Sequence, residues 1–155
     1  MTTATIGVIS DTHGLLRPEA VAALHDSDLI IHAGDVGDPE ILERLRAIAP
    51  THAVRGNVDT SPWAQALPLT DVVEVGDVHI FVIHSLSDMD LDPKAAGFAA
   101  VIAGHTHRPH AEVRDDVLYL NPGSAGPRRF TLPIAVARLQ VSGSRISYDI
   151  VELRV

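Results

Sequence analysis

Side chains able to bind a metal recur in this sequence where apolar, strand-like segments end. The segment 5–9 is followed by Asp11 and His13, and the segment 28–32 is followed by Asp35. In open α/β sheets, ligands bind beyond the carboxyl ends of the strands, so we expect these side chains to gather at one place. Imidazole, carboxylate and amide groups are ligands for divalent metals. The full set is Asp11, His13, Asp35, Asn57, His84, His105 and His107.

The spacing of these residues has a physical explanation. Asp11 and His13, and likewise His105 and His107, are separated by one residue, and in an extended segment such pairs point the same way. Each pair is therefore expected to approach one site together. A glycine directly precedes three of the ligand candidates, and its missing Cβ permits the sharp turns that aim them inward. These glycines are Gly34, Gly56 and Gly104. Each fragment alone also occurs in ordinary turns, but the ordered set indicates a metal site.

The elements that position these residues form a mixed pattern. In the first half, strands at 5–9, 28–32 and 51–55 alternate with helices at 18–24 and 39–48, which favours a parallel sheet covered by helices. The second half is mostly strands, with a hairpin turn at 76–77 and further turns at 115–116, 121–123 and 142–144. Its predicted strands are 71–74, 78–83, 99–103, 117–120, 134–139 and 146–151. The sequence thus predicts a mixed α/β domain with two packed sheets, spanning 1–155 as one unit.

Composition excludes several classes of protein. The 155 residues contain no cysteine, so disulfides, thiolate metal sites and cysteine nucleophiles are ruled out. With 12 basic and 20 acidic residues the net charge is −8, which does not favour binding to duplex nucleic acid. No apolar run approaches the roughly 18 residues that span a bilayer. Because the first residues show no secretory signal, we expect a cytoplasmic protein without a membrane partner.

Taken in order, the ligand candidates resemble the motifs of the calcineurin-like metallophosphoesterases. The segment 54–59 (VRGNVD) and the later Asn121-Pro122-Gly123-Ser124 are similar to the small bacterial and archaeal phosphodiesterase branch. That branch is related to the retromer subunit called vacuolar sorting protein 29. The resemblance covers about 5–130 and implies an α/β (α+β) fold, a four-layer sandwich of two mixed sheets flanked by helices.

The resemblance also implies a dinuclear metal centre. One divalent ion would take Asp11, His13, Asp35 and His107, and the other would take Asp35, Asn57, His84 and His105. Asp35 would bridge the two ions, and a metal-bridging hydroxide would attack the phosphate ester. In this scheme Asp35 and Asn57 are catalytic, and Asn57 also contacts the substrate. Manganese is the expected metal, with iron, nickel or zinc as alternatives.

This sequence departs from the larger family members at one mechanistic position. They carry a histidine after the Gly-Asn pair that is thought to protonate the leaving group, whereas this chain has Val58. General acid catalysis typically contributes about 10²–10⁴-fold in rate, so modest activity is expected. Asp59 is a candidate proton donor, with a turn residue as the alternative. Arg128 could contact phosphate or be ordinary surface charge. The acidic run 85–92 could shape substrate entry or be a solvated loop.

Three functions remain open from the sequence. The first is a metal-dependent phosphodiesterase acting on a small phosphate ester. The alternatives are a phosphomonoesterase and a non-catalytic protein-binding scaffold like the retromer subunit, because fold alone does not define function. The presence of all seven ligand positions favours an enzyme over a scaffold. Relatives are often homodimers or homotetramers, so self-association is a further expectation.

Overall fold

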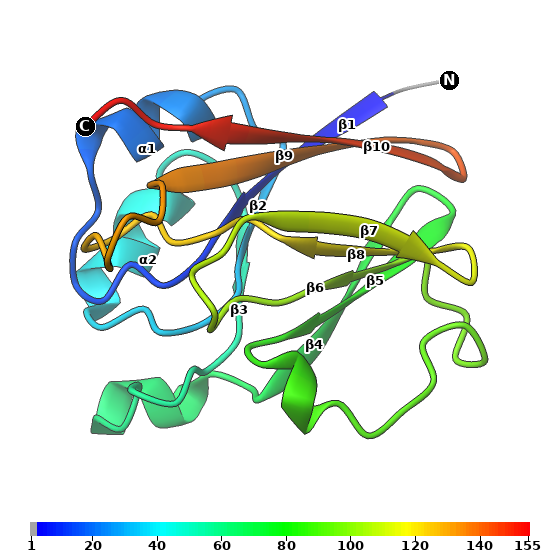
Figure 1. Ribbon diagram of the computed structural model, residues 1–155, viewed down its shortest axis with the longest axis horizontal. Helices are drawn as coiled ribbons and strands as arrows, with labels where there is room; N and C mark the ends of the chain where they lie inside the picture. The colour runs from blue at the N-terminus through cyan, green and yellow to red at the C-terminus, as the bar shows by residue number, and fades with distance from the viewer. Residues whose placement is uncertain (1–2) are drawn as a thin grey trace.

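The computed structural model describes residues 3–155 and contains two five-stranded mixed sheets (Figure 1). The first sheet has the order β10-β9-β1-β2-β3 and the second the order β4-β5-β6-β8-β7. The strands of the first sheet are β1 (Thr3–Ile9), β2 (Leu29–His32), β3 (Thr51–Ala53), β9 (Ala135–Ser142) and β10 (Arg145–Glu152). Those of the second are β4 (Thr70–Val75), β5 (Val78–Ile83), β6 (Ala100–Ile102), β7 (His110–Arg114) and β8 (Val117–Asn121).

The parallel core of the first sheet follows the predicted alternation of strands and helices. Strands β1, β2 and β3 pair in parallel and are linked by helices α1 (Pro18–Leu24) and α2 (Pro39–Arg46). Both helices begin at proline, which suits the first helical position, and the Asp38 side chain caps α2 by accepting the Glu40 N–H. Strand β9 adds antiparallel to β1, and β10 completes a hairpin with β9.

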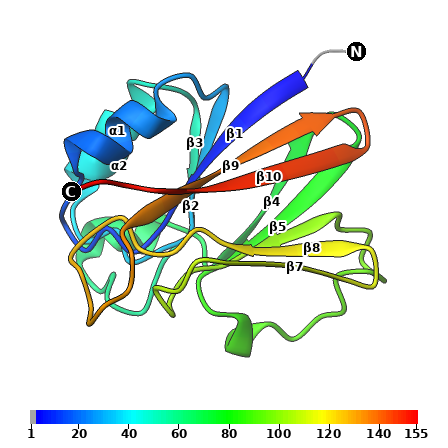
Figure 2. The same ribbon diagram turned by 45° about the horizontal axis from the view of Figure 1, so that its top comes forward.

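Three apolar clusters define the layers. One lies between the two sheets and includes Ile6, Val8, Ile80 and Ile102. A second packs α1 and α2 on the outer face of the first sheet, the side away from β4–β8 in Figure 2. The third covers the outer face of the second sheet with half-buried side chains from the segment 89–98. The fold class predicted from the sequence is confirmed, with an irregular segment and a short 3₁₀ helix, η2 (Leu86–Asp88), forming the outermost layer instead of an α-helix.

Some elements differ from the sequence prediction. Strand β7 and the 3₁₀ helix η1 (Pro62–Ala66) were not predicted, and β3 ends at Ala53 instead of continuing to Arg55. The hairpin turn at 76–77 is confirmed because β4 pairs antiparallel with β5 across it. Within residues 3–155, no helix has the length and apolar character needed to span a membrane.

Candidate metal centre

Two groups of possible metal ligands lie beyond the carboxyl ends of the strands. The ligand atoms of each group lie within 4.8 Å of one another. The first group contains Asp11 and His13 from the loop after β1, and His107 from the loop after β6. The second contains Asp35 from the loop after β2, His84 from the end of β5, and His105 from the loop after β6. The structure thus brings together six of the seven predicted ligands in two groups.

In the first group, a buried carboxylate oxygen faces two imidazoles. Asp11 Oδ1 lies 3.4 Å from His107 Nε2 and 3.8 Å from His13 Nε2, and it has no hydrogen-bond partner among residues 3–155. The other oxygen, Oδ2, accepts the hydroxyl of Ser10 and the backbone N–H of His105. Because buried polar atoms are almost always paired, the orphaned Oδ1 beside ring nitrogens fits a cation ligand.

In the second group, one oxygen of Asp35 lies between the two sets of ligands. Asp35 Oδ2 is 3.1 Å from His84 Nε2 and 3.7 Å from His13 Nε2, while Oδ1 accepts the Val58 N–H at 3.0 Å. A single carboxylate oxygen therefore faces both groups, as a bridging ligand must. Two-metal phosphoesterase sites hold their ions roughly 3.5–4 Å apart, a separation that one carboxylate can span.

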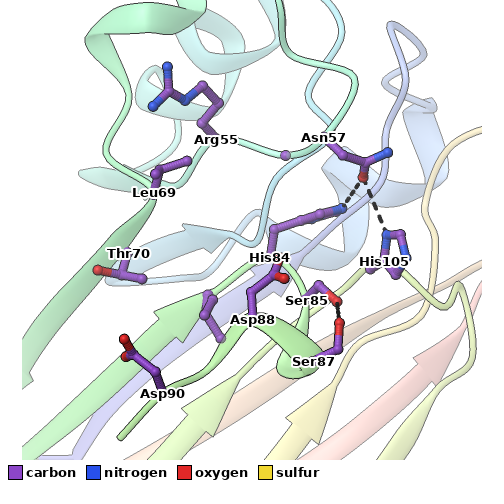
Figure 3. Close-up of a pocket in the computed structure, with 12 residues that line it drawn as sticks. Arg55, Asn57, Leu69, Thr70, His84, Ser85, Ser87, Asp88, Asp90 and His105 are labelled. Atoms are coloured by element: carbon purple, nitrogen blue, oxygen red, sulfur yellow. Dashed lines mark hydrogen bonds between the residues drawn. The ribbon is translucent and has the colours of Figure 1, made fainter.

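Asn57 and His84 complete the second group (Figure 3). Asn57 Oδ1 lies 3.0 Å from His84 Nε2 and 3.3 Å from His105 Nδ1. His84 Nδ1 lies 2.7 Å from the Ala33 carbonyl oxygen, and a ring N–H donated there leaves Nε2 to face the ligands. Such a hydrogen bond fixes the orientation of a metal-binding histidine. All seven predicted ligand residues are therefore adjacent.

The pKa values of the facing groups move in opposite directions. Burial would raise the pKa of Asp35, but its hydrogen bonds with His84 and the Val58 N–H lower it to about 2. Burial would lower the pKa of His84, but the hydrogen bonds to Asp35 and to the Ala33 carbonyl raise it above its ordinary value. A cation is bound by neutral imidazole and ionised carboxylate, so metal binding is expected to release a proton from His84 wherever that side chain is protonated.

The backbone at the ligands is strained. Asp11, His13, Asp35, His105 and His107 have φ values of 55°, 47°, 55°, 73° and 63°. Positive φ is uncommon for residues other than glycine, and it clusters at functional sites that the surrounding structure holds in place. The prediction that the paired residues sit in extended chain is therefore wrong. The left-handed turns send His105 and His107 to different groups, although Asp11 and His13 do share one.

The glycines before the ligands act in two ways. Gly34 has a φ of +102° and makes the sharp turn that the sequence predicts. Gly56 and Gly104 have no positive φ, and they are needed instead for close packing. A Cβ on Gly56 would overlap the backbone nitrogen of Asp35, and one on Gly104 would overlap the Ser10 hydroxyl. The expectation of sharp turns at these two positions is corrected accordingly.

His32 supports the site from beneath, and the sequence assigned it no role. Its side chain is fully buried, Nδ1 accepts the Gly34 N–H at 3.1 Å, and Nε2 lies 3.0 Å from Thr12 Oγ1. Thr12 in turn donates its hydroxyl to the Val36 carbonyl. These bonds require the neutral Nε2–H form, and burial lowers the pKa of His32 to about 4. The network ties the loop after β1 to the loop after β2.

Asp59 and Arg128 have clear structural partners. The buried Asp59 carboxylate accepts three backbone N–H groups, from Val36, Gly37 and Gly56, which supports its interpretation as the residue that holds these loops. Arg128 is exposed and donates to the Leu132 carbonyl of its own loop, so the structure does not place it in either ligand group. A proton-donating Asp59 and a phosphate-binding Arg128 stay predictions.

A cavity of about 650 Å³ adjoins the second group. Figure 3 shows Asn57, His84 and His105 on one side of it, with Arg55, Leu69, Thr70 and Asp90 on the other. Part of the acidic run 85–92 lines this cavity, and a role of this run in shaping substrate entry stays a prediction. The lining residues from this run are Ser85, Ser87, Asp88 and Asp90.

Comparison with known proteins identifies the family. The model of the calcineurin-like phosphoesterase superfamily domain matches residues 5–144, so the chain belongs to that superfamily. A probable metallophosphoesterase of Methanothermobacter thermautotrophicus is 35% identical over 161 residues, covering 94% of this chain and 91% of the relative. These matches confirm the resemblance inferred from the motifs, and the two ligand groups are candidate metal sites of a family member.

Solved structures agree with this assignment. An archaeal phosphodiesterase superimposes with a TM-score of 0.77 at 26% identity, covering 95% of this chain and 99% of its own length. Vacuolar protein sorting 29 from Cryptosporidium parvum superimposes with a TM-score of 0.79 at 18% identity, covering 98% of each chain. The second likeness shows the shared fold alone, because fold does not carry function with it.

Proposed function

We propose that this protein is a phosphodiesterase that works with two divalent cations. Asp11, His13, Asp35 and His107 would hold one cation, and Asp35, Asn57, His84 and His105 the other. The observation that carries the proposal is the position of Asp35 Oδ2, 3.1 Å from His84 Nε2 and 3.7 Å from His13 Nε2. When bound, such cations neutralise phosphoryl charge and lower the pKa of water, which supplies a nucleophile near neutral pH.

The residues of the chain orient the ester. Asn57 directs Oδ1 toward His84 and His105, so its Nδ2 can donate a hydrogen bond to a phosphoryl oxygen. Val58 is 46% exposed and carries no proton to give to a leaving group. We therefore infer a preference for alcohols that depart without protonation. Asp59 stays a candidate proton donor to the leaving group only if it releases its three N–H partners. Arg128 stays a candidate phosphate contact only if its loop rearranges.

The adjoining cavity favours a diester over a monoester. Its volume of about 650 Å³ falls within the range of roughly 300–1,000 Å³ typical of small-molecule sites, far more than a phosphate group needs. The second organic substituent of a diester has room there. Manganese is the metal we propose, with a cytoplasmic location and a homodimer or homotetramer as further inferences from the family.

The test is hydrolysis by metal-stripped protein with each divalent ion restored in turn. Bis(p-nitrophenyl) phosphate should turn over faster than p-nitrophenyl phosphate, and only with metal present. His84→Ala should abolish turnover, whereas His79→Ala, an exposed position on strand β5, which ends just before His84, should not. Faster monoester hydrolysis would make the protein a phosphomonoesterase. Bound metal without any turnover would support the scaffold function and overturn the proposal.

A further inference from the structure

The cavity beside the second ligand group is lined by apolar, charged and hydroxyl-bearing side chains. Arg55 and Leu69 lie on the side opposite Asn57, His84 and His105, and Asp90 projects from the loop below them in Figure 3. Apolar surface from Leu69 and Ile83 is interrupted by charged and hydroxyl groups. The hydroxyl groups come from Thr70, Ser85 and Ser87, and the charged groups from Arg55, Asp88 and Asp90.

The charges in this cavity are unbalanced. Asp88 and Asp90 are exposed, and neither carboxylate has an ion-pair partner among residues 3–155. Arg55 is the cavity's only basic side chain apart from histidine, and its guanidinium donates to the Gln65 side chain. Two carboxylates without ion-pair partners therefore line the cavity together with one guanidinium, which donates one of its N–H groups to Gln65. The lining outside the ligand group therefore carries a net charge of −1, from Arg55, Asp88 and Asp90.

We propose that this cavity binds the second organic substituent of a phosphodiester and selects a cationic or hydroxyl-bearing group over an anionic one. The inference rests on the proposed function, since the ester phosphate must sit at the ligand groups for its substituent to reach the cavity. Asp88 and Asp90 attract the positive charge of an ammonium-bearing arm and accept hydrogen bonds from a hydroxyl-bearing one, and Leu69 and Ile83 contact the carbon atoms of the arm. A second phosphate or carboxylate on that arm meets the two carboxylates and is disfavoured.

The selectivity can be measured with three p-nitrophenyl phosphodiesters. Their second alcohol is choline, the uncharged carbon isostere of choline, or isethionate, which carries a sulfonate. In each reaction the bond from phosphorus to nitrophenolate breaks, a water oxygen takes its place on phosphorus, and one proton goes to solvent. The second arm stays on the phosphate. Work at 0.15 M salt, where the Debye length is about 8 Å, restricts the comparison to charges near the arm.

The wild-type protein should prefer the choline ester over the isethionate ester by about tenfold in kcat/KM, with the neutral ester between them. The double variant Asp88→Asn/Asp90→Asn should reduce this ratio to about twofold or less, by the same charge argument. Arg55→Gln should widen the ratio. Asp92→Asn is the matched control, because Asp92 belongs to the same acidic run but turns its carboxylate to the N–H groups of Lys94 and Ala95, outside the cavity lining.

Two outcomes overturn the inference while leaving the proposed function intact. One is equal kcat/KM for all three esters by an active enzyme. The other is an equal change of the ratio in Asp92→Asn and in the double variant, which would assign the preference to the overall negative charge of the protein. Absence of turnover on all three esters with metal bound is a different result, because it overturns the proposed function itself.

Discussion

His32 is held neutral beneath the loops that carry Asp11 and Asp35, and this makes the stability of the fold depend on pH. The imidazole is fully buried and its two nitrogens are both engaged, one by the Gly34 N–H and the other with the Thr12 hydroxyl. Protonation would place a charge in the core and replace the acceptor at Nδ1 with a second donor. Acidification of the metal-free protein should therefore destabilise the folded state.

The size of the effect follows from the pKa values. Burial lowers the pKa of His32 from 6.5 to about 4, against the opposing influence of Asp11, Asp59 and Asp35 and with a smaller contribution from His84. Between these pH values the unfolded chain binds a proton that the folded chain does not. Stability is therefore complete above pH 6.5 and falls as the pH drops to about 4, by about 3 kcal/mol.

The assay is urea unfolding in the presence of a chelator, followed from pH 4 to pH 8. His13 also has a lowered pKa, owing to burial, and contributes in the same direction. The contribution of His32 is therefore taken as the difference between the wild type and His32→Asn, whose amide oxygen can still accept the Gly34 N–H. The variant should be less stable at pH 8, and the two unfolding free energies should converge as the pH falls to 4.

Parallel stability curves for the wild type and His32→Asn would contradict a buried, neutral His32. The free energies of unfolding of the wild type and His32→Asn would then differ by an amount that stays constant within about 1 kcal/mol from pH 8 to pH 4. Such a result would mean that keeping His32 neutral in the folded state costs no stability at low pH. The raised pKa of His84 does not confuse this outcome. Burial opposes that rise and the bonds to Asp35 and Ala33 cause it, so the stability that His84 contributes is lost only as the pH rises above 6.5.

Three further predictions concern the ligand loops. Gly56→Ala should lower the free energy of unfolding by about 1–3 kcal/mol in urea titrations, because the new Cβ overlaps the Asp35 backbone. The control is Gly97→Ala, where a Cβ meets nothing within 4 Å and only the positive φ costs stability, by about 1 kcal/mol. Equal losses in the two variants would contradict the packing argument. Asp35→Asn should remove both metals in calorimetric titrations, and retention of two bound ions would reject a bridging role. Val58→His should raise kcat/KM more for esters with poor leaving groups than for activated ones, and an equal change would count against a missing general acid.

The alternation of strands and helices made the first sheet predictable. The parallel strands β1 and β2 carry apolar runs that end at turn residues, and the two helices that link the parallel strands begin at proline. Strand β7 escaped prediction because its five residues, His110–Arg114, are mostly exposed and include no buried side chain. Its existence depends on pairing with β8, whose buried residues were recognised, so tertiary context decided that segment.

The membership of the site was predictable, but its geometry was not. Residue types and order identified the seven ligand candidates, which the structure brings together. The left-handed backbone at Asp11, His105 and His107 has no signal in the sequence, because these residues adopt it only where the surrounding fold enforces it. His32 was missed for a related reason. A histidine at the end of an apolar strand gives no sign that both its nitrogens connect two loops.

Each ligand group draws residues from both sheets, and this has a consequence for a chain without cysteine. Asp11 and His107, brought to one cation, would close a loop of about 96 residues across the interface between the sheets, as a disulfide does in secreted proteins. Unlike a covalent bridge, such a cross-link would tighten or loosen with the free metal concentration, because ligand binding stabilises by RT ln(1 + [L]/Kd). The melting temperature of this protein would then report the metal supply around it.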